Sequence, residues 1–141
     1  MLEFENLIKC LSDKAKNYDI IICLETLLTS THLVRLLNKI NKDNIKVVLD
    51  TGNIASSNNC LYSEVKILHK YLKHIHIKDK DSNDNNVYLG TGLVNFKDLF
   101  LGLKEINYLG PLVFETTRGS DPLNTAKDNI NMCNYFTNKV K

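Results

Sequence analysis

Residues 47–53 read Val47-Val48-Leu49-Asp50-Thr51-Gly52-Asn53, an apolar run that ends in an acid and passes into a turn. Uninterrupted β-branched runs are typical of strands in a parallel sheet, because both faces of such a sheet are covered. Similar runs occupy residues 20–25, 74–77 and 111–115, and each is followed by apolar residues at helical spacing. The sequence therefore predicts four repeated strand–helix units.

The segments between these runs predict the helices. The first helix is expected over residues 2–17, ahead of the first strand. Residues able to cap the four later helices are Thr29, Ser63, Asn95 and Asp121, the last followed by Pro122 at the first helical position. The order α-βα-βα-βα-βα predicts an α/β fold with a parallel sheet in one domain, residues 1–141. In such sheets, functional residues gather at the carboxyl ends of the strands.

Composition narrows the classes of function. The chain has 141 residues, 43% hydrophobic and 24% charged, with a formal net charge of +2, which suits one globular domain without nucleic acid as a partner. Its four cysteines are widely spaced and are expected to be reduced thiols in a cytoplasmic protein. No apolar run approaches the roughly 20 residues of a membrane helix, so no membrane partner is expected.

Each predicted strand carries, at or near its end, a side chain that can bind a metal ion: Glu25, Asp50, His76 and Glu115. A charge at the end of a buried strand is costly unless it is paired or coordinated. Three carboxylates and one imidazole suit Mn²⁺, Mg²⁺, Co²⁺ or Zn²⁺. The other interpretation is that each acid caps a helix or joins a surface ion pair, and the spacing leaves both open.

Secondary candidates flank these positions. Asn53 either hydrogen-bonds a substrate hydroxyl or satisfies its own turn. Lys78 and Asp79 either form an ion pair at the rim of the sheet or contact substrate. Arg118 either meets a phosphate or sugar oxygen or lies solvated in its loop.

Two further features are interpreted structurally. His74 falls on the same face of its strand as His76 and is expected one layer deeper, in the core or behind the ligands. Gly90 and Gly92 are expected to allow a loop to approach the site closely.

The ordered set of motifs resembles the second half of the xylose isomerase-like barrel superfamily. The segments that carry the resemblance are Leu24-Glu25, Leu49-Asp50-Thr51-Gly52-Asn53, His74-Ile75-His76-Ile77-Lys78-Asp79, residues 89–96 and residues 108–115. Within the superfamily, the chain is most similar to the hexulose-6-phosphate isomerase and L-ribulose-5-phosphate 3-epimerase group. The resemblance implies a partial (β/α)₈ TIM barrel of about four parallel βα units, the C-terminal half of the whole.

By position, the resemblance implies that Glu25, Asp50, His76 and Glu115 bind one divalent metal ion, and that Glu25 and Glu115 also move protons. Asn53, Lys78 and Arg118 are the candidate substrate-binding residues, taken from their positions next to these motifs. The implied activity belongs to carbohydrate metabolism, with a small sugar or sugar phosphate as the partner. It is isomerisation or epimerisation of a ketose through an enediolate, in which one glutamate removes a proton and the other returns one.

Full members of this superfamily have eight strands, whereas only four are predicted here. Four strands cannot close such a barrel, so the first and last strands are expected to be exposed edges. Three outcomes stay open: a homodimer closes the barrel, a complementary N-terminal half-barrel chain completes it, or the chain is a truncated or split form. Two alternative functions follow, a non-catalytic half-barrel subunit and, on the related barrel, an apurinic endonuclease-like phosphodiesterase.

Overall fold

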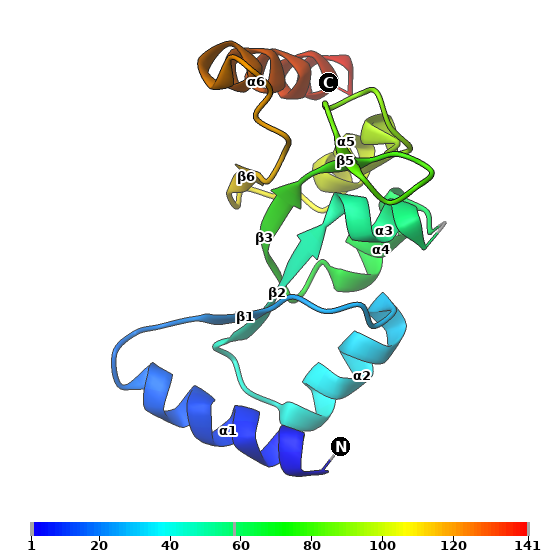
Figure 1. Cartoon of the computed structure of the whole chain (residues 1–141). Coiled ribbons are helices and arrows are strands. Elements are labelled where there is room, and N and C mark those ends of the chain that lie inside the picture. The colour runs from blue at the N-terminus through cyan, green and yellow to red at the C-terminus, as the bar shows by residue number, and fades with distance from the viewer. Residues whose placement is uncertain (1, 58, 141) are drawn as a thin grey trace.

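The computed structural model describes residues 2–57 and 59–140, and its elements alternate along most of the chain (Figure 1). The helices are α1 (Leu2–Lys16), α2 (Ser30–Ile40), α3 (Thr51–Ser56), α4 (Leu61–Leu68), α5 (Phe96–Glu105) and α6 (Pro122–Lys139). The strands are β1 (Ile22–Leu24), β2 (Ile45–Asp50), β3 (Leu72–Ile77), β4 (Asp79–Lys80), β5 (Asn86–Val87) and β6 (Leu112–Phe114).

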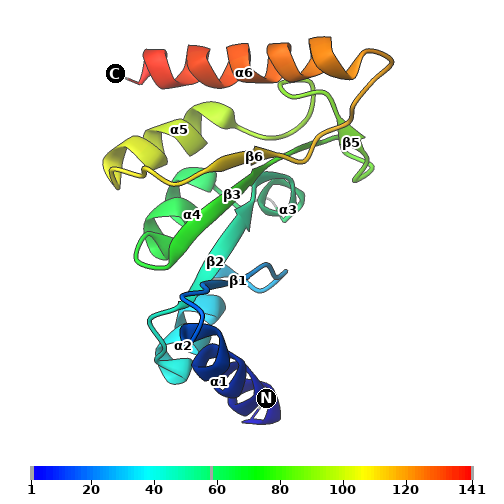
Figure 2. The same cartoon turned by 90° about the vertical axis from the view of Figure 1, so that its left-hand side faces the viewer.

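Four strands form one parallel sheet in the order β1-β2-β3-β6, so the predicted α/β class and parallel sheet are confirmed. Five of the helices form a row in the same order: α1 contacts α2, α2 contacts α4, α4 contacts α5 and α5 contacts α6. Figures 1 and 2 show α1 and α6 at opposite ends of this array. The sheet and its helices thus form an open arc, a partial barrel with β1 and β6 at its edges.

The two faces of the sheet differ in burial. Ile45, Val47, Leu49 and Ile75 alternate along β2 and β3 and are almost fully buried in the hydrophobic core that they share with the helices. The residues between them, such as Lys46 and Val48, are only partly buried. Because parallel sheets usually have both faces covered, this more open face is the one that would line a closed barrel.

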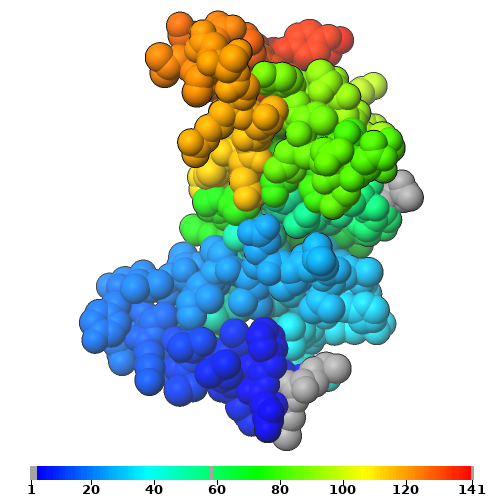
Figure 3. All heavy atoms as spheres, viewed as in Figure 1, coloured from blue at the N-terminus to red at the C-terminus, as the bar shows by residue number. Residues whose placement is uncertain are grey.

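Both ends of the arc expose apolar side chains. Phe4, Leu7 and Leu11 recur on one side of α1, and Leu123 and Ile130 are exposed on α6. The space-filling view shows these two helices, in blue and in orange to red, far apart on the molecule (Figure 3). Among the described residues, none of the helices combines the length and apolar character needed to cross a membrane.

The helix starts follow local capping chemistry, with two differences from the sequence prediction. Thr29, Asn95 and Asp121 cap α2, α5 and α6 as predicted. The segment after Asp50, predicted as a turn, continues as the short helix α3, because the Asp50 side chain accepts a hydrogen bond from the Asn53 N–H. The helix predicted to open at Ser63 instead begins at Leu61.

The polar loop predicted after residue 80 contains a small antiparallel hairpin, β4–β5, organised by Asp79. This carboxylate is fully buried and accepts hydrogen bonds from four backbone N–H groups at 2.9–3.0 Å, those of Lys80, Gly90, Gly92 and Val94. A Cβ at Gly92 would lie 2.4 Å from Asp79 Oδ1, so the expected close approach at this glycine is an approach to Asp79. An ion pair of Asp79 with Lys78, one of the two alternatives for these residues, is therefore replaced by backbone contacts.

We expect Asp79→Asn to destabilise the fold by about 3 kcal/mol, because an amide turns an NH₂ group toward two of the backbone donors and leaves them unsatisfied. Urea unfolding followed by circular dichroism measures the loss. The same substitution at the exposed Asp128 of α6 is the control, expected within about 0.5 kcal/mol of wild type. Equal midpoints for both variants would contradict the role of Asp79.

Candidate metal and active site

The four strand-end residues come together at one rim of the sheet. Asp50 ends β2 and His76 lies one residue before the end of β3, where the two are register partners. Glu25 and Glu115 directly follow β1 and β6. One ligand atom from each of the four side chains lies within 4.8 Å of all the others. The parallel topology causes this convergence, because the carboxyl ends of all four strands meet at the same edge.

Distances within the cluster are those of groups that interact directly. His76 Nδ1 lies 3.4 Å from Glu25 Oε2 and 3.2 Å from Glu115 Oε2. The same Nδ1 and Asp50 Oδ2 are buried atoms without a hydrogen-bond partner in the described part of the chain. Buried polar atoms are rarely left unsatisfied, so these two atoms are candidates for contact with a ligand.

His74 lies behind this cluster. Its ring meets that of His76 edge-to-face, with the centroids 5.0 Å apart. It is partly buried and stands outside the group of four converging side chains. This position agrees with the expectation that His74 sits deeper than His76.

Lys78 brings a positive charge into the cluster, which the sequence did not reveal. Its side chain is only 12% exposed, and its Nζ lies 3.0 Å from Asp50 Oδ2 and 2.9 Å from Glu115 Oε2. The contact with Asp50 is an ion pair without hydrogen-bond alignment, since Oδ2 is among the unsatisfied atoms. Lys78 thus bridges the ends of β2 and β6, the two strands on either side of its own.

These contacts change two pKa values. The hydrogen bond from Lys78 is the largest influence on Glu115 and, against the opposing effect of burial, holds the pKa of this carboxyl below its ordinary value. Burial is the largest influence on Lys78 and would lower its pKa, but the hydrogen bond to Glu115 and the negative charges of Glu115 and Asp50 together outweigh it, so the pKa is raised. Glu115 is therefore held ionised and Lys78 protonated at neutral pH.

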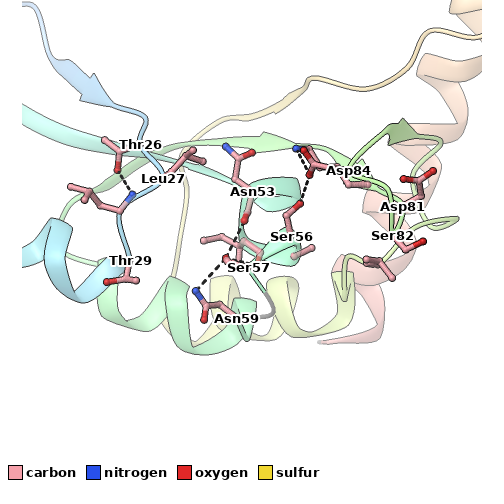
Figure 4. Close-up of a pocket in the computed structure, with 15 residues that line it drawn as sticks. Thr26, Leu27, Thr29, Asn53, Ser56, Ser57, Asn59, Asp81, Ser82 and Asp84 are labelled. Carbon is pink, nitrogen blue, oxygen red and sulfur yellow. Dashed lines mark hydrogen bonds and ion pairs between the residues drawn. The ribbon is translucent and has the colours of Figure 1, made fainter.

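A cavity of about 790 Å³ opens beside the cluster, between the loop after β1, helix α3 and the β4–β5 hairpin. Its wall is mixed: Thr26, Thr29, Asn53, Ser56, Ser57 and Asp84 are among the polar lining residues, and Leu27, Leu28, Ile54 and Leu93 are among the apolar ones (Figure 4). Two of its lining residues lie close to the cluster in sequence, since Thr26 directly follows Glu25 and Asn53 lies three positions after Asp50. None of the four converging residues lines the cavity. The cavity is therefore a neighbour of the cluster.

The predicted substrate-binding residues fall at different places. The Asn53 N–H donates a hydrogen bond to Asp50 Oδ1, and the residue lines the cavity. Lys78 lies within the cluster. Arg118 is exposed in the loop before α6, where its carbonyl accepts a hydrogen bond from Thr125. The structure thus brings Lys78 to the metal-binding candidates and leaves Arg118 outside that group.

Comparisons with known proteins agree with this architecture. Residues 3–135 match the model of the xylose isomerase-like TIM barrel family. A crystal structure of a xylose isomerase domain protein from Planctomyces limnophilus superposes with a TM-score of 0.84 at 23% identity, over 98% of this chain and 54% of that chain. At this identity the superposition establishes the fold alone.

Two curated proteins are similar in sequence. L-ribulose 3-epimerase from Methylomonas sp. (strain DH-1) is 33% identical over 109 residues, which cover 74% of this chain and 37% of that protein. Ketose 3-epimerase from Arthrobacter globiformis is 29% identical over 117 residues, 77% of this chain and 39% of that protein. The chain therefore spans well under half the length of these relatives.

We expect Lys78→Met to raise the pKa of the Glu115 carboxyl in chelator-treated protein, measured by ¹³C NMR. Because the folded pKa is lowered, the pair stabilises the fold above the ordinary pKa of the carboxyl and loses this effect as pH falls through the lowered value. Lys80→Met is the control, since Lys80 pairs with Asp84. Contrary results would be an unchanged Glu115 titration in Lys78→Met, or an equal shift in both variants.

Proposed function

The chain belongs to the xylose isomerase-like TIM barrel family, and on that premise we propose that it is a sugar epimerase or isomerase. The proposed substrate is a ketose or ketose phosphate, and the proposed cofactor is one divalent metal ion. The names of the two similar curated proteins support the substrate class. The observation that carries the proposal is the convergence of Glu25, Asp50, His76 and Glu115 within 4.8 Å.

The donor atoms fit a divalent ion in spacing and chemistry. Ligands about 2.1 Å from an octahedral ion lie about 3 Å from their neighbours and about 4 Å from the ligand opposite. The contacts of 3.2 and 3.4 Å around His76 Nδ1, and the 4.8 Å limit of the whole group, agree with such a shell. Oxygen donors with one imidazole favour Mn²⁺, Mg²⁺, Co²⁺ or Zn²⁺, and four protein ligands leave positions for substrate oxygens.

The residues have distinct roles in the proposed reaction. The bound ion would supply Lewis-acid polarisation of the ketose carbonyl, which acidifies the neighbouring C–H bond. Glu25 and Glu115 reach the cluster from the two edge strands, so they approach its centre from different sides. One carboxylate takes the proton from carbon, and the other, in its acid form, returns a proton to the substrate. Return to the same carbon from the opposite face is epimerisation, and return to the adjacent carbon is isomerisation.

Substrate contacts are proposed for Asn53, Lys78 and Arg118. The cavity lined by Asn53 combines polar side chains with apolar surface, which suits a sugar, because the sugar hydroxyl groups need hydrogen-bond partners when they leave water. Lys78 would face substrate oxygens near the cluster, and Arg118 would contact the sugar or a phosphate if its loop turns toward the rim.

We propose that the chain forms the C-terminal half of a barrel that needs four more βα units, in the same polypeptide or another. The edge strands β1 and β6, the open face of the sheet and the exposed apolar side chains of α1 and α6 support this. Either a second copy of the chain or a complementary N-terminal half-barrel chain could supply a separate missing half.

A non-catalytic subunit remains the competing function, favoured by the open sheet. For location we propose the cytoplasm, which is supported by the four free thiols of Cys10, Cys23, Cys60 and Cys133.

Proton transfer is tested by incubating the protein with Mn²⁺ and a panel of ketoses and ketose phosphates in D₂O. We expect NMR to show deuterium at the carbon next to the carbonyl, at a rate that falls at least about a hundredfold in Glu115→Gln, since proton transfer by a positioned group contributes that much. Glu105→Gln is the control, because Glu105 pairs with Lys66 away from the cluster.

Metal-dependent exchange that is equal in the two variants would remove Glu115 from the chemistry. If exchange is absent while Mn²⁺ binds to the cluster, the chain by itself is a metal-binding subunit, and the proposed proton transfer then requires the four further βα units. The panel also separates free ketoses from their phosphates.

A further inference from the structure

Lys78 is held along its length by the segment that follows Asp50. The fully buried Thr51 hydroxyl donates a hydrogen bond to the Lys78 carbonyl at 2.5 Å and accepts one from the Lys78 N–H at 2.9 Å. At Gly52 a Cβ would lie 3.0 Å from Lys78 Cδ and 3.1 Å from Cγ, so the lysine stem passes where no side chain has room. The ammonium then ends 3.0 Å from Asp50. Backbone, stem and charge are therefore all fixed by three consecutive residues.

Glu115, the other partner of this ammonium, is held far less firmly. It follows β6, an edge strand of three residues, and its side chain is 51% exposed. A free glutamate side chain loses conformational entropy when it is fixed. Lys78 Nζ, 2.9 Å from Glu115 Oε2, belongs to a side chain that is only 12% exposed and is held by its other contacts. Through this contact Lys78, which follows the central strand β3, restrains the carboxylate of Glu115 at the edge of the sheet.

The charge of the cluster adds a second consequence. The carboxylates of Glu25, Asp50 and Glu115 carry three negative charges when ionised, and Lys78 reduces the sum to two, the charge that one divalent cation neutralises. Yet a lysine beside a cation also repels it. Lys78 therefore either orders Glu115 for the cation or competes with the cation for Glu115, and the two effects have opposite signs in a binding experiment.

We propose that Lys78 is a positioning residue that fixes Glu115 for binding of the divalent cation, through the anchor formed by Asp50, Thr51 and Gly52. This inference rests on the proposed function, because it requires Glu115 to be a ligand. Lys78 is held in place by Asp50, Thr51 and Gly52. This favours ordering of Glu115 over competition with the cation, because a competing lysine must be free to move away when the cation binds.

A double-mutant cycle separates the two effects. Mn²⁺ affinity is measured by calorimetry for wild type, Glu115→Gln, Lys78→Met and the double variant. We expect Glu115→Gln to weaken binding at least about tenfold in wild type but less than about threefold in the Lys78→Met background, because residues in direct contact are coupled. Lys80→Met is the control background, in which the full loss from Glu115→Gln is retained. In the Lys78→Arg background, which keeps the charge, Glu115→Gln is expected to weaken Mn²⁺ binding nearly as much as it does in wild type.

Equal losses in the wild-type and Lys78→Met backgrounds would overturn the inference, and so would a larger loss in Lys78→Met, which identifies a competitor. Either result is compatible with the proposed metal site itself, because Glu115→Gln still weakens Mn²⁺ binding. If wild type binds no Mn²⁺, or Glu115→Gln binds it as tightly, the proposed ligand set fails and the inference fails with it. Circular dichroism establishes folding of each variant, and Lys78→Gln replaces Lys78→Met in the cycle if the methionine variant does not fold.

Discussion

Three carboxylates meet at one end of a four-stranded parallel sheet, and their mutual repulsion has to be balanced by positive charge. Lys78 supplies part of this charge from within the chain, and the atoms left unsatisfied at Asp50 and His76 indicate where more is needed. The local structure around the rim follows from this requirement. Asp50 divides its two oxygens between the N-terminus of α3 and Lys78, so that one residue joins the fold to the site.

The sheet that creates this convergence is open. Helices cover one face, the other is partly exposed, and each edge strand has only three residues. Glu25 and Glu115 both follow these edges, whereas Asp50 and His76 lie on the longer central strands. The two proposed proton-transfer groups are the most exposed members of the cluster. Strands paired against both edges would order them, which links barrel closure to catalysis in physical terms.

The sequence predicted the large elements well because their signals are local. The apolar runs, the capping side chains of Thr29, Asn95 and Asp121 and the strict alternation of elements led to the parallel sheet and its two edges. The convergence of four strand ends was predictable as well, since parallel topology alone brings them together. Their roles as ligands stay a prediction.

The missed features depend on contacts between residues far apart in the chain. Asp79 binds backbone groups up to 15 positions later, and Thr51 contacts Lys78 across 27 positions, so neither has a signature in spacing or composition. For Lys78 the sequence offered an ion pair with its neighbour Asp79 or contact with substrate, but parallel pairing put Asp50 and Glu115 within its reach. Helix α3 was missed because it has only six residues and its start is set by one capping carboxylate.

The most direct test of the shared metal centre is anomalous X-ray diffraction from crystals of the protein grown with Mn²⁺. We predict a single anomalous peak per chain, within about 2.4 Å of donor atoms from Glu25, Asp50, His76 and Glu115, the range of metal–ligand bonds to such donors. A fully occupied peak elsewhere on the molecule, or none at millimolar Mn²⁺, would contradict a metal centre at the strand ends.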